Sequence, residues 1–269
     1  MNPVEELHVS HAPAQLAEVE FHSPSTNDFW LPLFEVGGLE FTRGMLVIVL
    51  VTGLLVAWML WAAKRAAVVP SKGMFVTEGI YNFARNDIAR DLIGGQKFKP
   101  YLPLIFSLFV FVLVNNLLGV IPPVQMPTMS SIAFPLALTL VVYLTYHVAG
   151  IKQHGLVGYL KTFVPSGLPA PIVPVVFLLE FVSKTITQPL TLVLRLFGNM
   201  LAGHMALALF IMGGWFLVNS GPLMAIAGAG SWIMGLLMTF FEILIQCLQA
   251  YVFTLLSASY IGAALADDH

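Results

Sequence analysis

One arginine, Arg195, stands in a stretch that otherwise has the composition of a membrane interior, because no other charged residue lies between Lys184 and Glu242. A guanidinium stays protonated at any physiological pH, so burial cannot neutralise it as it can neutralise a carboxylate or a lysine. Holding such a charge at bilayer depth costs about 3 to 15 kcal/mol. A cost of this size indicates that the fixed positive charge has a function.

Polar residues accompany this arginine at helical spacing. At 100° per residue, the helical face through Arg195 carries small or polar side chains: Gln188, Thr191, Arg195, Asn199 and Ala202. His204 falls on the opposite face. In the last apolar segment, a second stripe with spacing i, i+4 and i+7 consists of Glu242, Gln246 and Gln249. Pro189 is expected to distort the helical phase of Gln188.

These residues allow two interpretations. The simpler one is a buried ion pair between Arg195 and Glu242, which makes the burial of both charges tolerable. The other is a path for protons or ions, because His204 and Glu242 are both titratable and ionisable residues in membrane segments usually mark such paths. An acid, a histidine, two glutamines and a permanent cation together favour the path.

The composition predicts the kind of protein that must position these side chains. Of 269 residues, 58% are hydrophobic and 10% are charged, against about 25% charged residues in soluble domains. Residues 100–151 carry no charge, and one spanning helix needs about 20 apolar residues. The segments are continuously apolar rather than alternating, which excludes a barrel. We therefore predict an all-α integral membrane protein, with too little net charge (−2) for a nucleic-acid partner and a single cysteine, which excludes an internal disulfide.

Five vertical or tilted spans are predicted within one membrane domain, residues 44–269, at about 44–63, 101–121, 132–149, 172–218 and 223–266. Seven of the twelve Lys and Arg residues lie between Lys64 and Lys99, so the positive-inside rule places this loop in the cytoplasm. The polar, acidic residues 1–43 are then outside, and the C-terminus is cytoplasmic. A helix over about 72–93 lies either on the inner membrane surface or in solvent. Residues 155–174 have the glycines and prolines of a loop with short helical turns.

The last two spans are longer than a membrane is thick. Residues 231–262 alone would form a helix of about 48 Å, against a hydrocarbon layer of about 30 Å. This helix must therefore tilt strongly or break. Small side chains such as Gly203 and Gly235 favour contact with other helices. We predict a strongly inclined C-terminal hairpin that a partner protein covers on one face.

Two runs of residues resemble the signatures of one family. Leu194 to His204 reads LRLFGNMLAGH and Glu242 to Phe253 reads EILIQCLQAYVF, and both are similar to the signatures of subunit a of F-type ATP synthases. The run from Asn116 to Pro122 and the order of spans also fit. The resemblance implies a non-catalytic stator subunit of the membrane Fo sector, in the bacterial plasma membrane. Its implied partners are a ring of c subunits, subunit b, the rest of the complex and the lipid bilayer.

The family mechanism implies two offset proton half-channels that Arg195 separates beside the c-ring. The stripes and the resemblance together assign proton translocation to Arg195, Asn199, His204, Glu242, Gln246 and Gln249. Further residues are expected as possible channel lining: Asn116, Glu180, Gln188 and Thr191. The pairing of His204 with Glu242 favours protons over sodium ions.

Other classes of protein fit less well. A self-contained proton-coupled transporter, the main alternative, would show two related halves, and none are apparent. An intramembrane protease would need a catalytic pair in the bilayer, and no Asp lies in any predicted span. No phosphate-binding loop is present, so we expect no ATP site on this chain and no cofactor. The spacing of His8, His11 and His22 is typical of a solvated tail rather than of a metal site.

Overall fold

The computed structural model describes residues 25, 30, 32–36, 39–65, 72–121, 125–164 and 167–266. Within these residues, five helices are long and apolar enough to cross a membrane. The prediction of an all-α integral membrane protein is thereby confirmed, with one small departure. That departure is a two-stranded antiparallel hairpin, in which β1 (Pro32–Val36) pairs with β2 (Leu39–Thr42).

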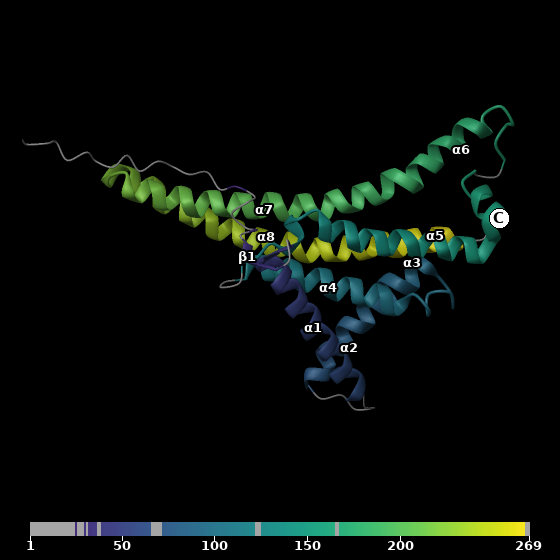
Figure 1. The fold of residues 1–269 in the computed structure, drawn as a ribbon, viewed down its shortest axis with the longest axis horizontal. Coiled ribbons are helices and arrows are strands. Elements are labelled where there is room, and N and C mark those ends of the chain that lie inside the picture. The colour runs from purple at the N-terminus through teal and green to yellow at the C-terminus, as the bar shows by residue number, and fades with distance from the viewer. Residues whose placement is uncertain are drawn as a thin grey trace, which may run out of the picture.

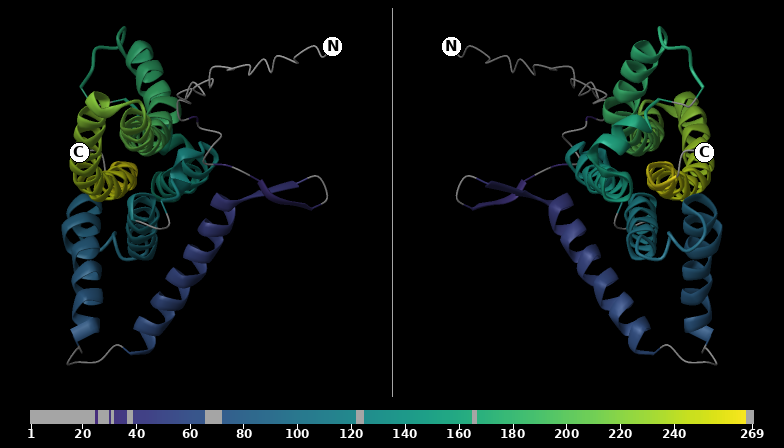
Figure 2. Two further views of the ribbon diagram at one scale, coloured as in Figure 1. Left: turned by 90° about the vertical axis from the view of Figure 1, so that its left-hand side faces the viewer. Right: turned by 90° about the vertical axis from the view of Figure 1, so that its right-hand side faces the viewer.

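The first long helix, α1 (Arg43–Lys64), begins directly after this hairpin and lies at the edge of the bundle, where it contacts α4 (Leu102–Val120) (Figure 2). Its start is set by Thr42, whose Oγ1 accepts a hydrogen bond from the backbone N–H of Met45 at 3.5 Å. Gly44 and Val51 are buried, whereas most other side chains of α1 are exposed or half-buried. The apolar surface of α1 therefore faces lipid or another protein.

Trp30 joins the start of α1 to the start of α5. Its Nε1 donates a hydrogen bond to Ser130 Oγ at 3.2 Å, and its ring stacks on Phe134 with 5.8 Å between ring centroids. The Trp30 ring also packs against Gly44, where a side chain would collide with it. One aromatic residue thus connects the first helix to a segment that follows it by many residues.

A continuous helical segment over residues 72–93 follows, as the sequence predicts. It consists of α2 (Lys72–Asn82), the π-helical turns of η2 (Phe83–Arg90) and the short α3 (Asp91–Ile93). Ala84 and Ile88 are fully buried, because η2 packs against α4 and α8. Phe75, in contrast, is 71% exposed. Placement of this segment on the inner membrane surface stays a prediction.

The next two long helices are α4 (Leu102–Val120) and α5 (Ala133–Lys161), with the 3₁₀ turn η3 (Thr128–Ser130) between them. α5 extends beyond the expected end of its span near residue 149, into residues for which a loop was expected. Gly155, at φ 70° and ψ 167°, explains the difference. Glycine adopts this conformation without a steric penalty, so the chain bends there and helical hydrogen bonding resumes.

The last third of the chain is a long helical hairpin that turns at Gly221. Its first arm is α6 (Val173–Val182), the π-helical η4 (Ser183–Thr187) and α7 (Gln188–Asn219), and its second arm is α8 (Pro222–Leu265). α8 packs along α7, α4 and α5, and thus forms the centre of the bundle (Figure 1). Its 44 residues are unbroken and measure about 66 Å. The sequence analysis left two outcomes for this long helix, a strong tilt or a break. The helix does not break.

Candidate functional site

The two faces of α7 lie in different surroundings. Arg195, Asn199 and Thr191 are exposed, whereas His204 is 5% exposed and points between α4 and α8. This orientation agrees with the helical phase, which sets His204 opposite Arg195. The amphipathic pattern of α7 therefore separates a fixed surface charge from a buried titratable ring.

The His204 ring is surrounded by acceptors. Its Nε2 lies 2.6 Å from the carbonyl oxygen of Gly119, and its Nδ1 lies 3.1 Å from that of Met200. Nδ1 also lies 3.4 Å from Glu242 Oε1. A ring with a proton on each nitrogen donates to all these groups, so the site accommodates a protonated histidine beside a carboxylate.

Glu242 lies in a network contributed by three helices. Its Oε1 accepts a hydrogen bond from Gln246 Nε2 at 3.0 Å, and both residues are at most 2% exposed. Asn116 Nδ2 of α4 donates to the backbone oxygen of Gln246 at 3.4 Å. We refer to Asn116, His204, Glu242 and Gln246 as the buried polar cluster.

The simple ion pair between Arg195 and Glu242 is not formed. Glu242 pairs with His204 instead, and Arg195 makes no salt bridge with any residue that the structure describes. Burial of Glu242 is therefore compensated within the buried polar cluster. The guanidinium remains available on the open face of α7.

Two glycines allow the helices to approach closely enough for these contacts. A side chain at Gly203 would collide with the Glu242 carboxylate, and one at Gly119 would collide with the His204 ring. The sequence indicated Gly203 as a contact position. Gly119 was not singled out, although it lies three residues after Asn116 in a run that fits the family.

A hydrogen bond connects the buried stripe of α8 with the exposed face of α7. Asn199 Nδ2 donates to Gln249 Oε1 at 2.7 Å, and Gln249 is 3% exposed. Four buried atoms nearby have no hydrogen-bond partner among the described residues: Asn116 Oδ1, Glu242 Oε2, Gln246 Oε1 and Gln249 Nε2. Buried polar atoms normally pair with protein groups or with water, so this region is suited to hydration.

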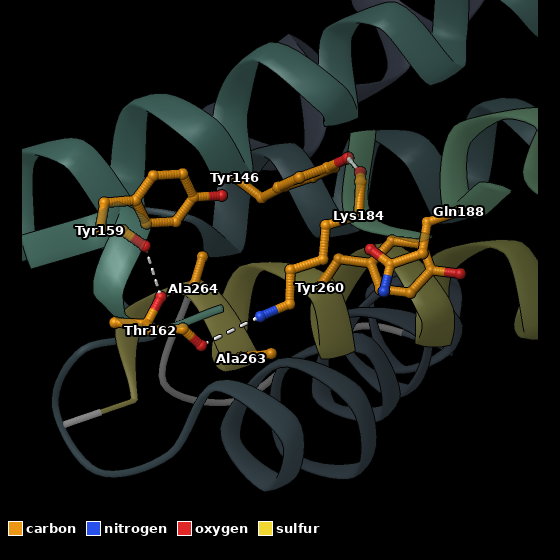
Figure 3. Close-up of a pocket in the computed structure, with 8 residues that line it drawn as sticks. All are labelled: Tyr146, Tyr159, Thr162, Lys184, Gln188, Tyr260, Ala263 and Ala264. Carbon is orange, nitrogen blue, oxygen red and sulfur yellow. Dashed lines mark hydrogen bonds between the residues drawn. The ribbon is translucent and has the colours of Figure 1, made fainter. Parts of the chain in front are cut away.

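A second set of polar side chains surrounds Gln188 and Thr191, two of the residues expected to line the channel. Gln188 borders a small cavity together with Lys184 and Tyr260 (Figure 3). Tyr260 lies within electrostatic reach of Arg195, and Thr191 Oγ1 donates a hydrogen bond to the backbone oxygen of Gln188 at 3.0 Å. Tyr260 was not identified from the sequence, although it falls about 20° from Gln249 on the helical wheel of α8.

The remaining expected residues are not brought into the buried polar cluster. Glu180 lies on α6, where its Oε2 is 3.7 Å from Lys184 Nζ. The N-terminal histidines lie outside the described residues. Within the described part of the chain, no group of three His, Cys, Asp or Glu side chains is arranged to hold a metal ion.

Comparisons with known proteins agree on one family. Residues 45–262 match the family model described as ATP synthase A chain. A protein from Nocardioides sp. named ATP synthase subunit a is 42% identical over 262 residues, which covers 93% of this chain and 95% of that relative. The subunit of the same name from Pseudarthrobacter chlorophenolicus is 40% identical over 260 residues, with 93% and 96% covered. That from Streptomyces lividans is 40% identical over 258 residues, with 93% and 89% covered.

Proposed function

The chain belongs to the ATP synthase A chain family, and on this premise we propose that it forms two offset proton half-channels beside the c-ring, separated by Arg195. Family membership makes it the proton-channel subunit of the Fo sector, in a bacterial complex that contains a c-ring. The half-channels and the roles of individual residues are the part proposed. Subunit b as a neighbour, an N-terminus outside and a C-terminus in the cytoplasm belong to the same proposal.

The single observation that carries the proposal is the division between the two faces of α7. A permanent cation lies on the open face, and a buried acid and histidine lie on the other. A ring carboxylate that arrives beside Arg195 meets a positive charge, which favours its ionised form and releases its proton. It must be protonated again before it enters lipid, because a bare carboxylate in an apolar medium is prohibitively costly.

The outer half-channel is assigned to the buried polar cluster. A proton taken up by His204 or Glu242 moves along groups that both donate and accept hydrogen bonds. The Asn199–Gln249 hydrogen bond then leads from the cluster to the open face of α7. Gln188, Thr191 and Glu180 are assigned to the inner half-channel, on the other side of Arg195.

Replacement of Arg195 by alanine tests the proposal. Arg195→Ala is expected to abolish ATP synthesis driven by a proton gradient, because ring carboxylates are no longer forced to release protons. Arg195→Lys is expected to be impaired as well, since burial can deprotonate a lysine. ATP synthesis and ATP-driven proton pumping are measured in membrane vesicles.

Arg90→Ala, which removes an exposed arginine of η2, serves as the matched control and is expected to retain synthesis. Co-purification of each variant with the c-ring and the soluble ATPase head establishes assembly. Normal synthesis by an assembled Arg195→Ala complex would contradict the proposal. Purification of the wild-type chain without these partners would support a self-contained transporter instead.

A further inference from the structure

A cavity of about 30 Å³ lies where α5 ends against η4 and the end of α8 (Figure 3). Its polar wall consists of three tyrosines, a threonine, a lysine and a glutamine: Tyr146, Tyr159, Tyr260, Thr162, Lys184 and Gln188. A water molecule needs about 10 to 15 Å³ of such space and two to four polar partners. The cavity therefore has room and partners for one or two water molecules.

Lys184 is held at this wall by three kinds of contact. Its Nζ donates a hydrogen bond to the backbone oxygen of Thr162 at 3.2 Å, lies 3.7 Å from Glu180 Oε2 and lies 4.6 Å from the centroid of the Phe163 ring. Thr162 caps the C-terminus of α5, where the helix dipole favours a cation. The ammonium group is thus fixed in place.

The backbone at Lys184 is fixed as well. In the π-helical turn η4, the N–H of Gln188 bonds to the oxygen of Ser183, so the oxygen of Lys184 would pair next with the N–H of residue 189. Residue 189 is proline, which has no N–H. The hydroxyl of Tyr146 donates to the Lys184 oxygen at 2.7 Å instead. The position of the lysine therefore depends on two helices.

The cavity lies close to the polar face of α7 that carries Arg195. Tyr260 belongs to its wall and lies within electrostatic reach of Arg195. Gln188, also in the wall, accepts a hydrogen bond at its backbone oxygen from Thr191 Oγ1 at 3.0 Å. Given the proposed half-channels, on which this step rests, the cavity lies on the inner route between the cytoplasm and the ring.

We propose that Lys184 is an ion-selectivity residue of this inner route, where it admits protons and keeps sodium ions out. A sodium ion enters a narrow site only where oxygen atoms replace its hydration shell. Lys184 offers three N–H donors and no acceptor, and its charge repels a second cation at close range. A proton needs no such shell, because it passes along water and hydroxyl groups by exchange of hydrogen bonds.

The charge-reversal variant Lys184→Glu provides the test. It replaces a donor with two carboxylate oxygens beside Glu180, a ligand set that binds sodium. ATP-driven proton pumping into inverted vesicles is compared in sodium medium and in choline medium of equal ionic strength. The wild type is expected to pump equally in both. Pumping by Lys184→Glu is expected to fall about threefold when the sodium concentration is about twice the Kd of sodium for the new site. A competing ligand lowers the rate by the factor 1 + [Na⁺]/Kd.

Lys161→Glu makes the same charge change at an exposed residue at the end of α5 and is expected to show no sodium dependence. Lys184→Gln keeps a donor for the Thr162 oxygen and is expected to show a weaker sodium effect, and it decides the matter if Lys184→Glu does not assemble. Equal pumping in both media, or equal loss in both, would assign Lys184 a tethering role and overturn the inference. In that case, if Arg195→Ala still loses ATP synthesis, the proposed half-channels stand and only the role of Lys184 is overturned. If Arg195→Ala keeps normal synthesis, the half-channels and the role of Lys184 are both overturned.

Discussion

At the residue scale, the protein keeps an ionisable acid in its interior by surrounding it with a histidine ring and a hydrogen-bonding amide. Glu242 is 2% exposed, and a lone carboxylate in that position would pay a large desolvation cost. The His204 ring and the Gln246 amide lie within 3.4 Å of its Oε1 and offset part of this cost. The second carboxylate oxygen has no partner among the described residues, so the acid keeps one site for an exchangeable proton.

Gly203 leaves room for the Glu242 carboxylate, so replacement of Gly203 tests whether the position of this carboxylate matters for proton pumping. Gly203→Ala places a methyl group against the Glu242 carboxylate, and overpacking of this kind costs about 1 to 3 kcal/mol. We expect proton pumping to fall about tenfold, the factor that corresponds to 1.4 kcal/mol, as measured by quenching of a pH-sensitive dye in vesicles.

Gly213→Ala is the matched control on the same helix. A Cβ atom at Gly213 meets nothing within 4 Å in this chain, and alanine has the better helix propensity. Pumping should therefore be unchanged in this variant. Equal losses in the two variants would show that the effect arises from the helix rather than from Glu242.

At the element scale, the π-helical turn η4 determines how the first arm of the hairpin meets α5. The turn ends at Thr187, and Pro189, two residues later, cannot donate to a backbone oxygen of the preceding turn. The Tyr146 hydroxyl compensates by bonding to the Lys184 oxygen. A π-bulge of this kind often marks a functional position in a helix.

Substitution of Tyr146 and of Pro189 separates the contribution of the Tyr146 hydroxyl from the effect of the missing N–H at Pro189. Tyr146→Phe leaves the Lys184 oxygen without its donor and is expected to cost about 1 to 3 kcal/mol of stability. In a Pro189→Ala background the cost should be smaller, because residue 189 then supplies an N–H. The measurement is the thermal denaturation midpoint of the solubilised complex for both single variants and the double variant.

Tyr143→Phe is the control, because Tyr143 lies on the same helix and its ring contacts that of Tyr146 edge-on at 5.5 Å. This variant should leave the midpoint nearly unchanged. Strictly additive effects of Tyr146→Phe and Pro189→Ala would refute the coupling between them.

Helix phase and helix length were accessible from the sequence, because the period of 3.6 residues fixes which side chains share a face. The opposite orientations of Arg195 and His204 and the stripe of Glu242, Gln246 and Gln249 follow from it. Contacts between helices were not accessible in this way. The bond from His204 to the Gly119 oxygen joins residues 85 positions apart, and no local pattern encodes such a distance. The Gly155 bend was missed for a related reason, since glycine permits a loop and a bent helix equally well.

At the scale of the whole molecule, the dominant feature is the length of α8. Its apolar residues extend over about 66 Å, and a hydrocarbon layer of about 30 Å accommodates this length only at a steep inclination. If α8 stays within the layer, its axis lies at least about 60° from the membrane normal, well beyond ordinary tilts of up to about 40°. A density map of the assembled complex in a lipid nanodisc measures this angle.

An inclined α8 presents a long side to a neighbouring protein rather than an end. Arg195 and Asn199 on the adjoining helix α7 are exposed on the chain alone, so under the proposed function this is the side that faces the c-ring. An axis within 40° of the membrane normal would contradict the prediction and would require long parts of α8 to leave the bilayer.

The Trp30 contact also has a consequence for biosynthesis. Trp30 and its partner Ser130 are 100 positions apart, and a ribosome that adds about 5 to 20 residues per second needs roughly 5 to 20 s to synthesise that interval. During this time the newly inserted α1 has not yet acquired the residues against which its N-terminal end docks. Nascent chains therefore pass through a stage of several seconds in which the first helix has been made but its Trp30 contacts have not yet formed.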